Sequence, residues 1–283
     1  MSKEKQNIPF LKWAGGKREL TNTLISFMPK NFNNYFEPFI GGGALFFALK
    51  NRNILENKNI FLSDKNTELI NTYNAIKHSH KSLLETLYKM QLNHNKESYY
   101  KIRNLDRDDD FCALDSTFRA ARFIYLNKTC FNGLCRHNSK GHFNTPMGSY
   151  KNPKIYDENL IVNANIALCN TKIQCCDFEN IEPIAKSGDF VYFDPPYYPL
   201  NSTSSFVSYT DNFLQESQER LFRLFKKLDN KGVKMLLSNS NTEFIRELYK
   251  DFTIIEIQAK RAINCKGDKR GKITELLIKG NYE

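Results

Sequence analysis

The chain has 283 residues, enough for one large domain or two modest ones, and its 41 Lys and Arg residues outnumber its 31 Asp and Glu residues. The net charge of +10 and the pI of about 9.1 favour a polyanionic partner, although an ordinary solvated basic surface would give the same totals. Seven cysteines, an odd number without a Cys-x-x-Cys pair, argue against disulfides and zinc. With a polar start and no apolar run near the ~20 residues of a membrane span, the composition predicts a cytoplasmic protein with no membrane partner and no metal site.

A glycine-rich turn is the first motif along the chain. The aromatic stretch 32–36 leads into Glu-Pro-Phe-Ile-Gly-Gly-Gly at residues 37–43, and residues 44–49 resemble the start of a helix. Glycines in such a turn permit positive φ and let a ligand approach the backbone closely. Because glycine clusters occur in many turns, this motif alone does not identify a ligand.

An acidic residue follows the next strand-like run. Residues 60–63 are apolar and β-prone, and Asp64 comes directly after them. Asp64 lies 21 residues after Gly43, close to the spacing of about 20 expected for the acid that binds a ribose in a dinucleotide-type βαβ unit. The alternative, a helix N-cap after a strand, is compatible with a ribose role.

The middle of the chain has a different character. From Asn71 to about Asn165 the strand signals disappear and apolar residues recur at helical spacing. All five histidines lie there, so we expect neither a histidine base nor a His-ligated metal in the rest of the chain. Residues 127–152 alternate basic and aromatic side chains between glycines. This pattern suits contacts to phosphates, guanine edges and base steps, and an ordinary basic hairpin with inward-packed aromatics is the alternative.

The most informative segment is Phe190–Tyr197, in which four aromatic or branched residues end in Asp-Pro-Pro-Tyr. The apolar part predicts a buried strand, and Pro195 and Pro196 must end it because proline supplies no ladder N–H. Asp194 and Tyr197 then lie at the carboxyl end of a strand, where open α/β sheets bind their ligands. One carboxylate, one free proline carbonyl and one aromatic face suit a planar ring that bears an NH₂ group. An ordinary strand-ending turn is the alternative.

Together these features narrow the choice of cofactor. A ribose acid without a complete Gly-x-Gly-x-x-Gly fingerprint, in a chain with acceptors for a ring amine, points away from NAD. It points towards S-adenosylmethionine, which needs a ribose and adenine site but carries no pyrophosphate. An exocyclic ring amine is a poor nucleophile, and two acceptors placed off the ring plane favour the tetrahedral nitrogen of an attacking amine.

The strand-like runs at the end of the chain complete the predicted fold. They lie at 172–173, 190–193, 234–238, 253–257 and 275–278. We therefore expect a Rossmann-like α/β catalytic domain that is interrupted by a helical insert. The expected catalytic domain comprises residues 1–70 and 166–283, and the insert comprises residues 71–165.

A basic segment interrupts the last two of these runs. Residues 260–272 hold six basic side chains, one acidic side chain and two glycines. We expect a flexible loop that contacts the phosphate backbone of a polyanionic partner without reading its sequence, through residues such as Lys269 and Arg270. A solubilising loop is the alternative.

Several motifs, spread in order over nearly the whole chain, carry a resemblance to a known family. They occupy residues 9–18, 35–47, 131–136, 143–150, 177–178 and 194–197. Together they resemble the Dam-type N6-adenine DNA methyltransferases, in particular the GATC-specific enzymes of restriction–modification systems. The resemblance implies a Rossmann-like, S-adenosylmethionine-dependent methyltransferase sheet and a helical insert that serves as the DNA target-recognition domain. It also implies transfer of a methyl group to N6 of an adenine in double-stranded DNA, with the base flipped out of the helix at a cost of about a few kcal/mol. A cognate restriction endonuclease is the further partner that it implies, and a solitary enzyme is the open alternative.

The resemblance also implies roles for individual residues. The catalytic turn is Asp194, Pro195, Pro196 and Tyr197. The methionine end of the cofactor is lined by Trp13, Gly15, Lys17, Glu37, Phe39, Gly41 and Gly43. Asp64 binds the ribose, and Asp177 and Phe178 bind the cofactor adenine. The DNA contacts are Lys12 near the target, Phe131 as an inserted ring, base-edge contacts at Leu134, Arg136 and Pro146, and Tyr150. Ser149 stands where the family often has arginine, which puts one contact in doubt.

Two other functions remain open on sequence grounds. Related enzymes that methylate RNA or a protein amide tend to carry asparagine where Asp194 stands, and they lack the insert. A non-catalytic DNA-binding regulator is disfavoured because both the Asp-Pro-Pro-Tyr turn and the glycine motif are intact.

Overall fold

The computed structural model describes residues 8–13, 15, 17–200, 213–260 and 272–282. Lys269 and Arg270 lie outside these residues. The chain divides into two compact units. Unit 1 comprises Met1–Gly16, Gly41–Ile54 and Asn66–Ile173, and unit 2 comprises Lys17–Ile40, Leu55–Lys65 and Gln174–Glu283. Unit 1 thus gathers the expected helical segment together with the start of the chain and the glycine-rich turn.

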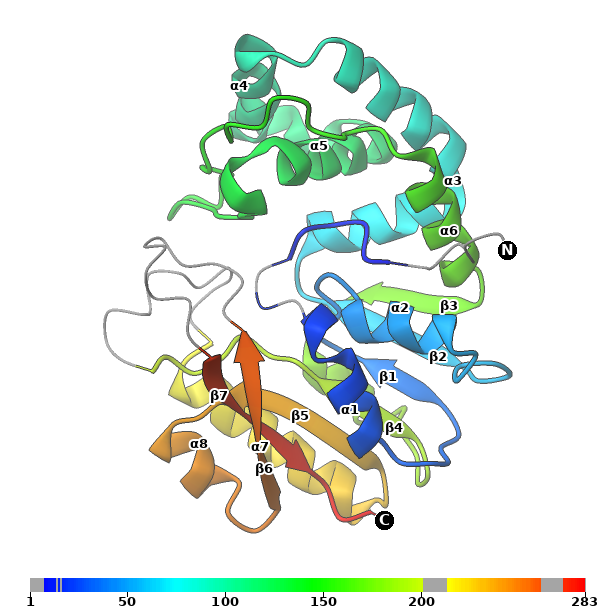
Figure 1. Ribbon diagram of the computed structural model, residues 1–283, viewed down its shortest axis with the longest axis vertical. Helices are drawn as coiled ribbons and strands as arrows, with labels where there is room; N and C mark the ends of the chain where they lie inside the picture. Colours follow the sequence, from blue (N-terminus) through cyan, green and yellow to red (C-terminus); the bar gives the residue numbers. More distant parts are fainter. Residues whose placement is uncertain (1–7, 14, 16, 201–212, 261–271, 283) are drawn as a thin grey trace. The chain divides into compact units, whose positions relative to one another are not determined.

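The described residues form one seven-stranded sheet. Its strands are β1 (Tyr35–Glu37), β2 (Ile60–Asp64), β3 (Thr171–Cys175), β4 (Phe190–Phe193), β5 (Lys234–Ser240), β6 (Thr253–Lys260) and β7 (Lys272–Lys279). Their order is β3-β2-β1-β4-β5-β7-β6, with β2, β1, β4 and β5 parallel and β7 antiparallel to both β5 and β6 (Figure 1). The order reverses direction between β1 and β4, as in Rossmann-like folds. The predicted α/β class is confirmed.

Two central strands bring their carboxyl ends together. All four residues of β4 are buried, as expected for an aromatic and β-branched strand covered on both faces. Tyr35 pairs with Phe190, so β1 and β4 are adjacent and run in the same direction. Glu37 is the last residue of β1, and Asp194 directly follows β4. Both carboxylates therefore lie at the switch point of the sheet, where such folds bind ligands.

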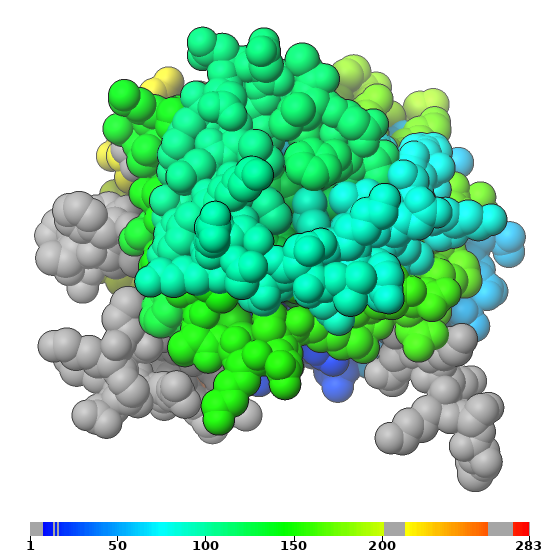
Figure 2. Space-filling model, turned by 90° about the horizontal axis from the view of Figure 1, so that it is seen from above, coloured from blue at the N-terminus to red at the C-terminus, as the bar shows by residue number. Residues whose placement is uncertain are grey.

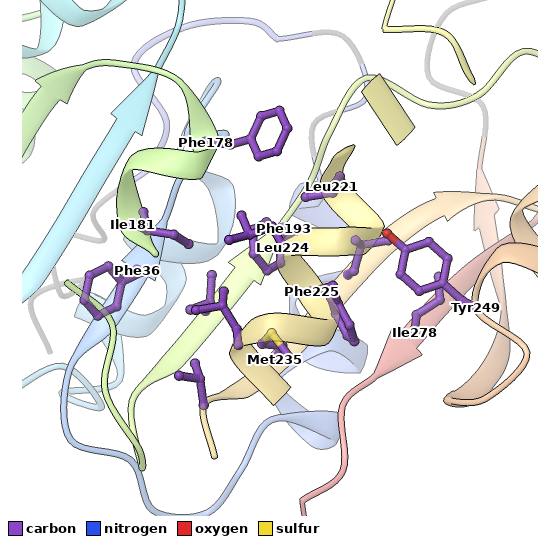
Figure 3. Close-up of a cluster of buried hydrophobic side chains, with 14 of the residues drawn as sticks. Phe36, Phe178, Ile181, Phe193, Leu221, Leu224, Phe225, Met235, Tyr249 and Ile278 are labelled. Atoms are coloured by element: carbon purple, nitrogen blue, oxygen red, sulfur yellow. The ribbon is translucent and has the colours of Figure 1, made fainter. Parts of the chain in front are cut away.

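The helix α7 (Gln215–Asn230) covers one face of this sheet. Its apolar residues recur every three or four positions and enter a core with β1, β4, β5 and β7 (Figure 3). Within this cluster Leu221, Phe225 and Phe193 are fully buried. In Figure 1, α1 (Thr21–Phe27) lies in front of the sheet and α7 behind it, and α8 (Glu243–Leu248) precedes β6. Truncating a buried Leu of this core to Ala would cost about 2–5 kcal/mol of stability.

Unit 1 is largely helical. It contains α2 (Ala44–Asn51), α3 (Thr67–Leu92), α4 (Lys96–Asn104), α5 (Ser116–Thr129) and α6 (Glu158–Leu168). Four of these helices begin after an Asn or Asp whose side chain accepts a hydrogen bond from the backbone N–H of the residue three positions later. These capping residues are Asn66, Asn95, Asp115 and Asp157. Figure 2 shows one face of this unit, with α3 in cyan and the segment around α4 in teal at the surface.

Short 3₁₀ turns complete the elements. They are η1 (Lys17–Glu19), η2 (Leu105–Arg107), η3 (Asp109–Ala113), η4 (Phe131–Gly133) and η5 (Phe178–Ile181). Between residues 71 and 165, which the structure describes throughout, the only β structure is a pair of isolated bridges. Of the helices in the described ranges, none combines the length and the apolar character that crossing a membrane requires. The same ranges hold no cluster of three or more His, Cys, Asp or Glu side chains suited to a metal.

Candidate functional site

The carboxylate after β4 is held by a buried lysine. Oδ1 of Asp194 lies 2.9 Å from Nζ of Lys17, whose side chain is 5% exposed. Burial raises the pKa of Asp194 above its ordinary value, the Lys17 ammonium opposes this shift, and the charge of Glu275 adds to it. The ion pair thus holds an acceptor in a poorly solvated position at the switch point of the sheet.

The tyrosine of the same turn is fixed at both its hydroxyl and its ring. The hydroxyl of Tyr197 donates to Oε2 of Glu275 at 2.7 Å, and Nζ of Lys17 lies 4.6 Å from the ring centroid. Burial, followed by the charges of Asp194 and Glu275, raises the pKa of Tyr197 well above its usual value. The phenol therefore stays protonated at neutral pH and offers a neutral aromatic face.

Buried amides hold the backbone on either side of that tyrosine. Nε2 of Gln218 donates to the carbonyl of Pro196 at 3.0 Å, and Oε1 of Gln218 accepts from Nδ2 of Asn239 at 3.0 Å. Oδ1 of Asn239 accepts from the N–H of Tyr198 at 3.1 Å, and the hydroxyl of Ser240 donates to the Tyr198 carbonyl at 2.7 Å. Gln218 and Asn239 have no exposed surface. We keep the name catalytic turn, from the role expected of residues 194–197, for residues 194–198, because Tyr198 shares the same supports; α7 and β5 fix the path of this segment.

The proline carbonyls of the catalytic turn are not equivalent. Pro196 already accepts the hydrogen bond from Gln218, whereas Pro195 is the buried residue next to the Asp194 carboxylate. The expected role of the Pro195 carbonyl as a second acceptor for a ring amine stays a prediction.

The expected cofactor residues of unit 2 lie near the ends of β1, β2 and β3. Glu37 is 2% exposed and accepts a 2.7 Å hydrogen bond from the hydroxyl of Tyr35. Asp64 is the last residue of β2. Phe39 stacks on Phe178 with 5.4 Å between ring centroids, and Phe178 is 2% exposed. The parallel pairing of β1 and β2 aligns the carboxyl ends of these two strands, and β3 is the next strand in the sheet.

Asp177 is more heavily engaged than the sequence suggests. Its Oδ1 accepts from the N–H of Glu179 and from Arg220, each at 3.0 Å, and its Oδ2 lies 3.4 Å from Nζ of Lys65. The guanidinium of Arg220 also lies 5.0 Å from the ring centroid of Phe178. The contact of Asp177 and Phe178 to a cofactor adenine remains a prediction.

In unit 1 the tryptophan packs against the glycine-rich turn. Gly41 and Gly43 have φ of 45° and 68°, which only glycine adopts readily. A Cβ at Gly41 would lie 2.6 Å from Nε1 of Trp13, and one at Gly43 would lie 2.7 Å from the hydroxyl of Tyr73. Gly15 has φ of 72°. The turn before α2 is thus a close-packed backbone surface that no larger residue could form.

A loop after α5 carries most of the expected DNA contacts. We call residues 130–150 the reading loop; it begins with η4 and is closed by the bridges Cys130↔Met147 and His137↔Phe143. Asn127 binds the backbone of Lys12 twice, accepting from its N–H at 2.8 Å and donating to its carbonyl at 2.7 Å. Nζ of Lys12 lies 4.2 Å from the ring centroid of Tyr150. The lysine expected near the target is therefore tied to this loop.

Exposure separates the aromatic residues of the reading loop. Phe131 and Tyr150 are 47% and 38% exposed, whereas Phe143 is 3% exposed. The inward-packed alternative therefore applies to Phe143 only. Arg136 and Pro146 are exposed and Leu134 is half-buried, so each has surface that a ligand can reach.

Sequence reasoning missed the residues that support the catalytic turn. Glu275, Gln218 and Asn239 belong to a strand, a helix and another strand, and none of them is part of a local motif. Lys17 was assigned to the cofactor, and the structure pairs it with Asp194. The only sequence signal for Gln218 and Asn239 was a polar side chain on an otherwise apolar face, which is too common to identify them.

Comparison with known proteins gives consistent results. A family model described as D12 class N6 adenine-specific DNA methyltransferase matches residues 13–263. The type II methyltransferase M1.LlaDCHI of Lactococcus lactis subsp. cremoris is 47% identical over 282 residues, which cover 98% of this chain and 97% of that protein. The type II methyltransferase M.MjaIII of Methanocaldococcus jannaschii is 46% identical, with 95% and 98% covered. A DNA adenine methylase of Vibrio cholerae is 35% identical, with 96% of each chain covered.

Proposed function

Because the chain belongs to the D12 class of N6 adenine-specific DNA methyltransferases, we propose that it methylates the adenine of GATC after flipping that base out of the duplex. The general activity follows from the family: the enzyme transfers a methyl group to N6 of adenine in DNA, with S-adenosylmethionine as the donor. The proposal adds the sequence that is read, the flipping step and the roles of individual residues.

The arrangement of Lys17 between Asp194 and Tyr197 carries the proposal. A single ammonium group lies both at hydrogen-bond distance from the carboxylate and over the tyrosine ring. An amino group on a planar base makes the same two demands, namely an acceptor for its N–H and an aromatic face for its ring. The catalytic turn therefore offers an N6-adenine amine the partners that it needs.

Each residue of the catalytic turn has its own role in the proposed methyl transfer. Asp194 accepts one N–H of the amine and the Pro195 carbonyl accepts the other, which favours a tetrahedral nitrogen with its lone pair directed at the methyl group. Tyr197 holds the ring of the base by stacking. S-Adenosylmethionine supplies a methyl group on a sulfonium sulfur, which is already a good leaving group. As the amine nitrogen takes the methyl group and the electron pair of the broken S–CH₃ bond stays on sulfur, the nitrogen would carry a positive charge. Asp194 would stabilise that charge until one N–H proton passes to water.

The residues present fit the cofactor. Gly41 and Gly43 are buried, and a Cβ at either would collide with Trp13 or Tyr73, so the turn that carries the expected methionine-end residues requires glycine at both positions. Separately, carboxylates end β1 and β2, and we assign Asp64 to the ribose hydroxyls. The remaining assignments are Trp13, Gly15, Lys17, Glu37 and Phe39 at the methionine end, and Asp177 and Phe178 at the adenine.

The reading loop supports the proposed sequence preference. An exposed arginine can bind O6 and N7 of a guanine with two hydrogen bonds, and we assign this role to Arg136. Leu134 and Pro146 would contact neighbouring base edges, and Phe131 would insert its exposed ring into the base stack. The remaining proposed DNA contacts, to the backbone or near the target, are Lys12, Tyr150, Lys269 and Arg270.

Two relatives are named type II methyltransferases, and we propose a restriction endonuclease with the same recognition sequence as a functional partner.

The decisive experiment incubates the purified enzyme and S-adenosylmethionine with GATC duplexes and with duplexes changed at one base pair. N6-methyladenine is then mapped, and a fluorescent adenine analogue at the target reports unstacking. We expect methylation at GATC only, with increased fluorescence on binding. Efficient methylation of duplexes that lack GATC would reject the sequence assignment.

A further inference from the structure

We propose that Asn144 is a positioning residue for sequence reading: it holds the guanidinium of Arg136 so that only the two terminal nitrogens of Arg136 are free to meet a guanine. The inference rests on the proposed base-reading role of Arg136 and assigns Asn144 a function of its own. Asn144 contacts the base only through Arg136.

The contact itself is specific. Nε of Arg136 donates to Oδ1 of Asn144 at 2.8 Å. The backbone repeats the pairing, because the N–H of Asn144 donates to the carbonyl of Arg136 at 2.9 Å. Among the described residues, the two terminal nitrogens of this exposed arginine have no hydrogen-bond or ion-pair partner.

The geometry of guanidinium turns this contact into a constraint. An arginine has five N–H donors in a planar fork, and it can present to a guanine either its Nε edge or its two terminal nitrogens. Because Asn144 occupies the Nε–H, only the end-on arrangement lets the guanidinium bind a guanine twice without breaking the bond to Asn144. Asn144 therefore selects the face of Arg136 that reads O6 and N7.

The backbone that carries Asn144 is anchored on both sides. Oδ2 of Asp106 accepts from the N–H of Phe143 at 2.7 Å, and Nη2 of Arg107 donates to the Phe143 carbonyl at 3.1 Å. The carbonyl of Thr145 accepts from the hydroxyl of Tyr99 at 2.9 Å. Both neighbours of Asn144 are thus tied to the helices of unit 1.

A buried ion pair fixes that anchor in turn. Asp106 lies 2.9 Å from Arg122, whose side chain is 4% exposed, and 2.7 Å from Arg107. Arg122 also donates to the carbonyls of Ile102 and Arg103, at 2.8 and 2.7 Å, where α4 ends. A continuous set of contacts therefore runs from the end of α4 to Asn144, and Arg136 is held by a rigid support.

The physical benefit is entropic. A free arginine loses much of its rotamer freedom when it binds a base, whereas one already held by Asn144 loses less. The correct guanine gains from this preorganisation, while a wrong base faces a guanidinium that cannot readily turn to find another acceptor. Losing Asn144 should therefore reduce discrimination at the base pair that Arg136 reads.

The test compares kcat/KM on GATC duplexes and on duplexes with one guanine replaced, for four variants. Arg136→Ala locates the guanine that is read, with an expected loss of discrimination of about 5- to 150-fold. Asn144→Ala should reduce discrimination at the same position by about 2- to 10-fold and leave other positions unchanged. Asn144→Asp keeps an acceptor for Nε of Arg136 and should therefore retain the wild-type discrimination at that position.

The matched control is Asn138→Ala in the same loop. Oδ1 of Asn138 accepts from the N–H groups of Lys140 and His142, each at 3.0 Å, and its side chain does not contact Arg136. We expect this variant to keep full discrimination. A similar loss in Asn138→Ala, or an equal loss at every position in Asn144→Ala, would show a general loosening of the loop and overturn the inference.

The remaining outcomes separate the two proposals. If Arg136→Ala relaxes discrimination and Asn144→Ala does not, the positioning role is wrong and the proposed function stands. If Arg136→Ala leaves discrimination unchanged at every guanine, the base-reading role of Arg136 is wrong and the inference falls with it.

Discussion

The catalytic turn and the reading loop are both held by hydrogen bonds to their backbone, but their supports differ in exposure. Gln218 and Asn239, which bind the backbone of Pro196 and Tyr198, have no exposed surface, and the hydroxyl of Tyr197 is bonded to Glu275. In the reading loop Asp106 and Arg107 bind the backbone of Phe143, and the side chain of Arg136 is exposed and, within the described part of the chain, bonded to Asn144 through Nε alone. Methyl transfer needs acceptors placed accurately and shielded from water, whereas sequence reading needs free donors on a rigid base.

This contrast predicts different costs of mutation. Replacing a side chain around the catalytic turn leaves a buried partner without its hydrogen bond, so chemistry and stability suffer together. Replacing an exposed side chain of the reading loop should remove a proposed contact to DNA and leave the fold unchanged.

The largest expected effect is on Asp194. We expect Asp194→Ala to reduce single-turnover methyl transfer by about 10³-fold or more, because one of the two amine acceptors is lost. Binding of cofactor and of duplex should largely persist. Asp251→Ala, an exposed aspartate of the same unit, serves as the control. Near wild-type turnover in Asp194→Ala would reject the assigned mechanism.

Gln218→Met tests whether the enclosed support matters. The change leaves the carbonyl of Pro196 and Nδ2 of Asn239 unpaired in the interior, so we expect a stability loss of about 1–3 kcal/mol and a fall in kcat of about 10- to 100-fold. KM for DNA should change little. Asn138→Ala in the reading loop should leave kcat unchanged. A fall in stability with kcat intact would mean that Gln218 has no positioning role.

The strands could be predicted from the sequence because their signal is local. The expected run 190–193 coincides with β4, and the runs at 60–63 and 234–238 fall within β2 and β5. Their apolar, β-prone composition and the prolines after β4 determine both position and end. The Asp-Pro-Pro-Tyr turn could be identified as a candidate site for the same reason.

The supports of the site could not be predicted because they depend on pairing between distant segments. Glu275 meets Tyr197 only because β7 runs antiparallel beside β5, a register that places Glu275 opposite Ser240. Lys17 and Asp194 form an ion pair although they are far apart in the sequence. Neither contact leaves a pattern in the local sequence, since register and strand order are set by the whole sheet.

The pH dependence of kcat tests the charges around Asp194. Asp194 stabilises the positive charge that develops on the amine only when its carboxylate is ionised, so activity should fall as the pH drops through its raised pKa, at a higher pH than for an ordinary aspartate. Lys17 lowers this pKa and Glu275 raises it. The acid limb should therefore move to higher pH in Lys17→Met and to lower pH in Glu275→Gln. A shift in the same direction in both variants would contradict the arrangement.

The smallest expected effect belongs to the helix that precedes the reading loop. Burial, together with the charge of Lys12, lowers the pKa of Lys128 in α5 to about 8. The side chain is therefore charged below pH 8 and neutral above it, so raising the pH from 7 to 9 removes one positive charge near the proposed DNA contacts. We expect a few-fold weaker duplex binding at pH 9, equal for all sequences, with the slope of log K against log salt reduced by about one phosphate contact.

Two variants of Lys128 separate this charge from other effects of pH. Lys128→Arg should stay charged to pH 9 and keep strong binding, because arginine does not lose its proton in this range. Lys128→Met should bind at pH 7 as the wild type does at pH 9, with little further change. If duplex binding by the wild type and by Lys128→Met weakens in parallel between pH 7 and pH 9, the group that titrates is not Lys128. If instead Lys128→Met loses discrimination between GATC and other duplexes, then the buried Lys128 side chain positions the residues of the reading loop. Its effect on DNA binding would then come from packing and not from its charge.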